Sequence, residues 1–197
     1  MTASPSPRFG AILLAGGRAS RMGGIDKPGL LVDGVSMRER AIAAVVSVNA
    51  DPVIVVGPES ASGHVVRWVR EDPPFSGPAA AVVTALAAMG ADAAEWTFLL
   101  ACDLPRPDAA IAALVHGVRG RDGLCLTDAG GRMQWLTGVY RTGALTDAAA
   151  ALPGEGRDLP VRALLSGLAV AALPHPGFGA RDVDTWEDYD ELTKEHP

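Results

Sequence analysis

Short runs of consecutive apolar residues alternate with longer segments of mixed polarity along this chain of 197 residues. A short apolar run is typical of a buried strand, whereas apolar residues three and four positions apart are typical of an amphipathic helix. By these criteria strands are expected at 11–14, 52–56, 65–69, 96–101, 124–127, 136–140 and 169–173. Helices are expected at 36–48, 78–89, 108–118, 143–152, 160–165 and 185–195.

This alternation predicts an α/β fold with a mostly parallel central sheet, because parallel strands are joined by helical crossovers. Ser36 and Thr185 are suitable helix N-caps, and Glu39 completes a capping box with Ser36. Gly90 and Gly120 are suitable positions for helices to end.

The sequence from Leu14 to Lys27, LAGGRASRMGGIDK, follows the first expected strand and is rich in glycine and basic residues. Glycine has no Cβ, so backbone N–H groups can crowd around an anion, and the basic side chains add positive charge. Neither a Walker A loop nor a GxGxxG fingerprint fits, since Lys27 precedes Pro28 and the glycine spacing differs. A surface turn is the simple alternative, but a turn has no need of Arg18, Arg21 and Lys27 together. The segment therefore predicts a polyphosphate-binding loop.

An acidic residue ends another expected strand, because Asp103 follows the apolar run 96–101. A carboxylate that faces a phosphate loop is suited to Mg²⁺, which takes oxygen ligands from carboxylates, phosphates and water. A helix N-cap or an Asx turn is the alternative for Asp103. Ligands of such sheets bind beyond the carboxyl ends of the strands. Four segments are therefore expected to share one crevice: the loop after Leu14, the turn after Val56, residues 71–74 and residues 103–105.

A second acidic pair stands near the end of the chain. Asp182 and Asp184 point the same way in an extended segment, since side chains alternate along it. Capping of the last expected helix is an equal alternative for Asp184.

The composition limits the classes of partner. The chain has 17 basic and 23 acidic residues and a formal net charge of −6, which argues against general nucleic-acid binding. No apolar stretch is suited to a bilayer span. Cys102 and Cys125 lack CxxC spacing, which predicts buried free thiols of a cytoplasmic protein rather than a zinc site or a disulfide framework. Residues 1–8 are expected to be a disordered N-terminus, and residues 9–195 a single domain.

Taken in order, these motifs resemble the MobA-like nucleotidyltransferase family, which contains the molybdenum cofactor guanylyltransferases. That family opens with LAGGxSxRMGxDK, against LAGGRASRMGGIDK at 14–27, and its ACDMP resembles ACDLP at 101–105. Its ED…GPLAG is matched loosely by EDPPFSGPAA at 71–80, and its closing NVNTPEDL resembles DVDTWEDY at 182–189. The resemblance runs from residue 9 to residue 190, nearly the whole chain.

The resemblance implies a Rossmann-like three-layer sandwich of the nucleotide-diphospho-sugar transferase type, and it implies three groups of site residues. The nucleotide would be bound by Leu14, Ala15, Gly16, Gly17, Lys27, Asp72 and Asp103. The catalytic residues would be Arg21, Lys27 and Asp103, with Mg²⁺ on Asp103. The acceptor would be bound by Arg157, Asp182 and Asp184.

The implied reaction transfers GMP from GTP to a terminal phosphate of molybdopterin, the organic part of the molybdenum cofactor, and releases pyrophosphate. The nucleophile is already anionic, so no general base is needed, and the four histidines are scattered. The Ala15-Gly16-Gly17 form of the loop favours GTP over CTP, because related cytidylyltransferases open with AAG. The alternatives are a cytidylyltransferase, a different phosphorylated acceptor, or a non-catalytic nucleotide-binding regulator. Beyond its substrates, a monomer or weak oligomer with transient contacts to molybdoenzymes or other cofactor-pathway proteins is expected, with no nucleic-acid or membrane partner.

Three departures from the family pattern concern the substrates rather than the class of reaction. Asp182 and Asp184 replace the two asparagines of the usual closing motif. Gln134-Trp135-Leu136 stands where relatives often have His-Pro-Leu, and Val56-Gly57-Pro58 stands where a guanine-associated asparagine is expected.

Overall fold

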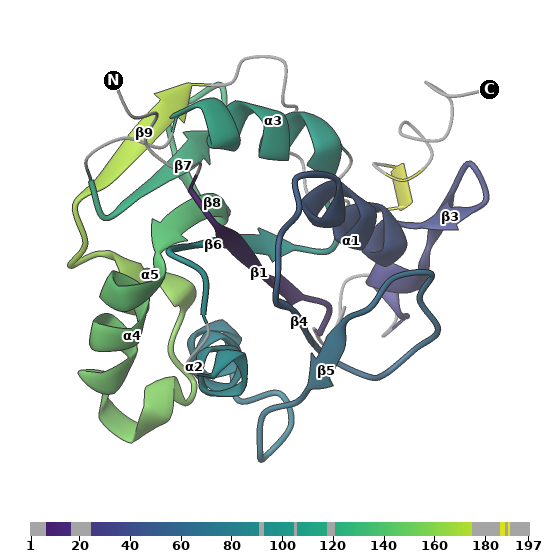
Figure 1. Ribbon diagram of the computed structural model, residues 1–197. Helices are drawn as coiled ribbons and strands as arrows, with labels where there is room; N and C mark the ends of the chain where they lie inside the picture. The colour runs from purple at the N-terminus through teal and green to yellow at the C-terminus, as the bar shows by residue number, and fades with distance from the viewer. Residues whose placement is uncertain are drawn as a thin grey trace.

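The computed structural model describes residues 7–16, 25–90, 93–104, 106–117, 121–174, 186, 187 and 189. Seven of the strands in these segments form one sheet in the order β5-β4-β1-β6-β8-β7-β9 (Figure 1). They are β1 (Phe9–Leu14), β4 (Val53–Val56), β5 (Arg67–Val69), β6 (Trp96–Ala101), β7 (Gly123–Thr127), β8 (Met133–Arg141) and β9 (Val170–Pro174). The helices are α1 (Met37–Ser47), α2 (Pro78–Met89), α3 (Pro107–Gly117), α4 (Thr142–Ala150) and α5 (Val161–Leu165). Two short 3₁₀ turns are η2 (Lys27–Gly29) and η3 (Pro153–Gly156).

The sheet is mostly parallel, as predicted. Strands β5, β4, β1 and β6 pair in parallel, and β7 pairs in parallel with β9. Only β8 among the strands of this sheet runs the opposite way, antiparallel to both β6 and β7. The reversal needs no helical crossover, since a short loop joins β7 to β8, and in it Asp128 Oδ1 accepts backbone hydrogen bonds from Gly130 and Arg132 at 2.9 Å each.

The sheet is covered by helices on both faces, which makes a three-layer α/β sandwich (Figure 1). Along β1, Ala11 and Leu13 pack in a core with α1 and α3, whereas Ile12 and Leu14 pack in a second core with α2, α4 and α5. Successive side chains of a strand point to opposite faces, so a strand buried on both sides is apolar throughout. This explains the continuous apolar runs in the sequence.

Most expected elements are present with shifts of a few residues, and the strand at 96–101 and the helix at 78–89 have the predicted bounds. The Ser36 hydroxyl caps α1 by accepting a hydrogen bond from the Glu39 backbone at 3.2 Å. Helix α2 ends before Gly90, whose φ of 74° suits a residue without Cβ. The expected helix stop Gly120, the N-cap Thr185 and most of the helix at 185–195 lie outside the described residues, and the division into 1–8 and 9–195 stays a prediction.

The structure contains a small hairpin that was not among the expected elements. Strands β2 (Leu31–Val32) and β3 (Val35–Ser36) pair antiparallel around Asp33 and Gly34, whose φ angles are 52° and 77°. Two consecutive positive φ angles define the tight turn for which Asp-Gly is a favoured dipeptide. The hairpin therefore has a signal in the sequence.

None of the helices in the described segments has the length and apolar character needed to cross a membrane. The thiols of Cys102 and Cys125 are both buried and unpaired, as predicted.

Candidate nucleotide site at the carboxyl edge of the sheet

Four parallel strands of the sheet end at the same level. Val69, Val56, Leu14 and Ala101, the last residues of β5, β4, β1 and β6, form one continuous row of paired positions. The pairing extends one residue further, because Ala15 donates to the Val56 carbonyl at 2.8 Å and Cys102 donates to the Leu14 carbonyl at 3.0 Å. The loops that follow these strands therefore leave the sheet at one edge, as the sequence predicted.

The first loop begins between two other loops. Ala15 is buried and Gly16 is exposed, and Gly57 of the neighbouring loop lies against the Ala15 backbone. A Cβ on Gly57, whose φ is 153°, would lie 3.0 Å from the Ala15 carbonyl carbon, so this close approach requires glycine. The exposed backbone of Gly16 is available to a ligand. Gly17 and Arg21, the next predicted contacts, lie outside the described residues.

Lys27 begins the η2 turn, between the first loop and the β2–β3 hairpin. The preceding residue, Asp26, forms an ion pair with Arg38 of α1 at 3.4 Å. Arg38 is 9% exposed and its guanidinium carbon lies 5.8 Å from the centre of the Trp68 ring. Neither Asp26 nor Arg38 was among the predicted site residues. A signal for Arg38 existed, since it shares a helix face with the buried Ala41, Ile42 and Val45.

Asp103 follows β6 and is partly buried. Residue Ala101, two positions before it, pairs with Leu14, which is two positions before Gly16. Asp103 and Gly16 therefore leave adjacent strands, and such strands lie about 4.8 Å apart. Helix α3 begins at Pro107, so Arg106 rather than Asp103 precedes its first residue. The N-cap alternative for Asp103 was therefore wrong.

The side chains around Asp103 limit which metal ion could bind there. Burial raises the pKa of the neighbouring Cys102 thiol far above its usual range, and the negative charge of Asp103 adds to this shift. The thiol is therefore protonated in the metal-free protein, and because Mg²⁺ takes oxygen rather than sulfur ligands, the Asp103 carboxylate is the hard donor at this position. The described residues contain no cluster of three or more His, Cys, Asp or Glu side chains that could hold a metal. Mg²⁺ takes most of its ligands from phosphates and water, so one carboxylate can suffice as its protein ligand.

Asp72 and Arg157, which were assigned to different substrates, lie together. Arg157 donates a hydrogen bond from Nη2 to the Asp72 carbonyl oxygen at 3.2 Å, and both residues are exposed. The loop around Arg157 is held against the start of α2, since Asp158 donates to the Ser76 carbonyl at 2.7 Å and Gly156 packs on Ala79. The loop around Arg157 therefore borders the segment that follows β5. Asp182 and Asp184 lie outside the described residues.

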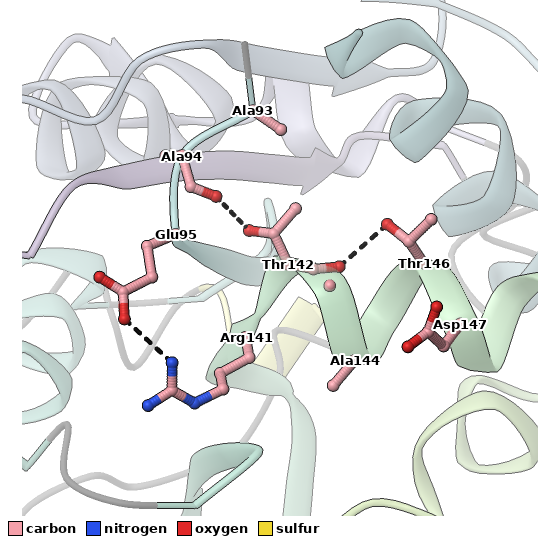
Figure 2. A pocket seen from close by; sticks show the side chains of 9 residues that line it. Ala93, Ala94, Glu95, Arg141, Thr142, Ala144, Thr146 and Asp147 are labelled. Carbon is pink, nitrogen blue, oxygen red and sulfur yellow. Dashed lines mark hydrogen bonds and ion pairs between the residues drawn. The ribbon is translucent and has the colours of Figure 1, made fainter. Parts of the chain in front are cut away.

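A separate pocket of about 470 Å³ lies at the opposite edge of the sheet, where β6 begins and β8 ends. Figure 2 shows two pairs among its polar groups: Arg141 with Glu95 at 2.9 Å, and the Thr142 hydroxyl with the Ala94 carbonyl at 2.6 Å. None of the predicted site residues lines it. Leu14, Ala15, Gly16 and Asp103 lie at the carboxyl edge of the sheet and not in this pocket.

Comparison with known proteins assigns the family. A model of the MobA-like NTP transferase domain matches residues 11–172. A probable molybdenum cofactor guanylyltransferase of Opitutus terrae is 30% identical over 204 residues, which cover 100% of both chains. The chain belongs to the MobA-like NTP transferase domain family and is an enzyme of the nucleotidyltransferase class.

Solved structures share the fold at low sequence identity. A molybdopterin-guanine dinucleotide biosynthesis protein A from Archaeoglobus fulgidus superposes with a TM-score of 0.66 at 17% identity, covering 94% of this chain and 97% of that one. An inositol-1-phosphate CTP transferase from T. maritima superposes with a TM-score of 0.67 at 12% identity, covering 97% and 96%. Proteins named for different nucleotides thus share this architecture, so the fold alone does not identify the base.

Proposed function

We propose that this protein transfers GMP from GTP to molybdopterin, with Mg²⁺, and releases pyrophosphate. The observation that carries the proposal is the register of β1 and β6, because the glycine-rich loop and Asp103 then follow the ends of two adjacent strands. The name of the Opitutus terrae relative, which is similar over the full length of the chain, supports the guanylyl group and the acceptor.

In the proposed reaction a terminal phosphate oxygen of molybdopterin attacks the α-phosphorus of GTP. A new P–O bond forms there, and the bond between the α-phosphorus and its bridging oxygen breaks, so the electron pair leaves with pyrophosphate. The attacking oxygen is anionic and needs no base. Catalysis then depends on alignment and on neutralisation of phosphate charge.

Each residue has a defined part in this proposal. Backbone groups of Leu14, Ala15 and Gly16 hold the nucleotide, with Gly17 continuing the loop. Lys27 and Arg21 neutralise charge on the β- and γ-phosphates as pyrophosphate departs. Asp103 would hold Mg²⁺, which supplies further charge neutralisation when bound.

The remaining residues are proposed to select the substrates. Asp72 faces the base or ribose, and Arg157 binds the phosphate of the pterin. Asp182 and Asp184 are proposed to complete the acceptor site.

The test supplies molybdopterin and Mg²⁺ with GTP, CTP or ATP and measures pyrophosphate release together with the dinucleotide product. The expected result is turnover with GTP well above turnover with CTP or ATP, and its loss on chelation of Mg²⁺. Preference for CTP would assign the cytidylyl reaction instead. Absence of pyrophosphate with every nucleotide, in a protein that still folds, would overturn the proposed reaction and favour a different acceptor or a non-catalytic nucleotide-binding protein.

A further inference from the structure

Arg38 is a buried arginine near the carboxyl edge of the sheet. Its side chain is 10% exposed, against 27% for Arg40, which lies two residues later on the same helix. Burial of a guanidinium costs free energy unless the charge is paired. The position of this charge therefore calls for a physical explanation.

The guanidinium of Arg38 joins three parts of the fold. Its Nη1 donates to Asp26 Oδ2 at 3.4 Å, and its carbon lies 5.8 Å from the centre of the Trp68 ring on β5. Trp68 packs against the core that α1 covers, so the ion pair lies on that side of the sheet.

Asp26 is in turn fixed to the turn that carries Lys27. Its carbonyl accepts a hydrogen bond from Gly29 at 3.0 Å, and Leu30 donates to the Lys27 carbonyl at 3.0 Å. The Asp26 carboxylate packs so closely on Gly29 that a Cβ there would collide with Oδ2. An interaction that fixes the Asp26 carboxylate therefore also fixes the η2 turn.

We propose that Arg38 is a positioning residue, which holds Asp26 and, through Asp26, the turn that presents Lys27 to the substrate phosphates. Arg38 also neutralises a carboxylate that would otherwise repel a polyphosphate. The inference rests on the proposed function for the identity of those phosphates. Its physical basis is preorganisation, since a lysine fixed before binding loses less entropy on contact.

The first test observes Lys27 itself and needs no activity. The chain contains two lysines, Lys27 and Lys194, so reductive ¹³C-methylation gives few NMR signals, and Lys27→Arg identifies one of them. Arg38→Met and Asp26→Asn are expected to shift or broaden the Lys27 signal, and the double variant to add nothing to Asp26→Asn. Arg40→Met is the matched control, because Arg40 pairs with Asp33 on the hairpin instead. An unchanged Lys27 signal in Asp26→Asn, or an equal change in Arg40→Met, would overturn the proposal even if Arg38→Met failed to fold.

The second test measures binding of Mg²⁺–GTP by calorimetry. Arg38→Met is expected to weaken binding about tenfold in the native background and less than about twofold in the Asp26→Asn background, because residues that act through one another are not additive. Equal losses in both backgrounds would show that the guanidinium acts on the phosphate directly, and would overturn the positioning role. If the wild-type protein bound no GTP, the proposed function would be wrong. The NMR signal of Lys27 would still show whether Arg38 positions Lys27.

Discussion

Arg157 and Asp72, which are 85 residues apart in the sequence, are joined by a hydrogen bond from the Arg157 guanidinium to the Asp72 backbone carbonyl at 3.2 Å. The side chain proposed for the acceptor phosphate therefore contacts the segment proposed for the nucleotide. The proposed acceptor site and the proposed nucleotide site therefore share a contact, and a substitution in one is expected to have a small effect on binding at the other.

Replacement of Arg157 by alanine tests this arrangement. The apparent Michaelis constant for the acceptor is expected to rise at least about tenfold, since a charge-assisted contact to phosphate is worth about 1.5–3 kcal/mol. The dissociation constant for GTP should change by only about fivefold or less, because the lost contact is a solvent-exposed hydrogen bond to Asp72, and a typical hydrogen bond contributes about 1 kcal/mol. Steady-state kinetics with each substrate varied in turn gives both values. Arg162→Ala, an exposed arginine of α5, is the control and should change neither. A GTP effect as large as the acceptor effect would contradict the assignment of Arg157 to the acceptor.

Asp103→Asn is expected to lower turnover by at least about 10²-fold, the scale of losing one electrostatic contact to a reacting group. A neutral amide is a poor ligand for Mg²⁺ and leaves triphosphate charge uncompensated. The melting temperature should change little, since Asp103 is only partly buried at the end of β6. Asp108→Asn on the exposed first turn of α3 is the matched control. The measurement is single-turnover rate at saturating Mg²⁺, and a rate within about threefold of wild type would remove Asp103 from the catalytic residues.

Gly123 allows a buried tyrosine to lie across the sheet. It pairs with Tyr140 of β8, and a Cβ on Gly123 would collide with the ring. The ring cannot move aside easily, because Tyr140 is fully buried and its hydroxyl donates to the Trp135 carbonyl at 2.7 Å. Gly123→Ala should therefore lower the free energy of unfolding by about 1–3 kcal/mol.

Gly143→Ala is the control for Gly123→Ala, because this substitution is expected to raise stability rather than lower it. Gly143 lies in α4, and no described neighbour lies within 4 Å of the position that its Cβ would occupy. The substitution should raise stability by about 0.5–1 kcal/mol, because alanine is the better helix former. Urea unfolding measures both variants. Equal stability of the two would show that the sheet at Gly123 can relax.

Alkaline pH should destabilise the protein through its buried thiols. Burial raises the pKa of Cys125 from 9.0 to about 11, and burial also raises the pKa values of Cys102 and Tyr140. The folded protein therefore retains protons that the unfolded chain releases. The stability from Cys125 is complete below pH 9 and is lost as the pH rises toward 11, with up to about 1.4 kcal/mol lost per pH unit for each ionising group. Urea unfolding between about pH 8 and pH 11 should show this decline, and Cys125→Ala should make it less steep. An identical slope in that variant would exclude Cys125 as a cause.

The sequence by itself determined the architecture, because the relevant signals are local. Residues 98–102 form an unbroken apolar run, since β6 is covered on both faces, and Asp103 stands directly after it. The end of a strand and the residue that follows it are neighbours in the chain. The alternation of strands and helices then suffices to predict that the loop after Leu14 and Asp103 share one edge of a parallel sheet.

Only the tertiary structure decided which side chains meet. The burial of Arg38 depends on Asp26 and on Trp68, which reach it from other elements, and the contact between Arg157 and Asp72 joins two distant loops. The reversed direction of β8 likewise follows from its pairing with β6 and β7. Hydrophobic periodicity records which face of an element is buried but not which distant residue covers it. Packing of the complete chain selects those partners.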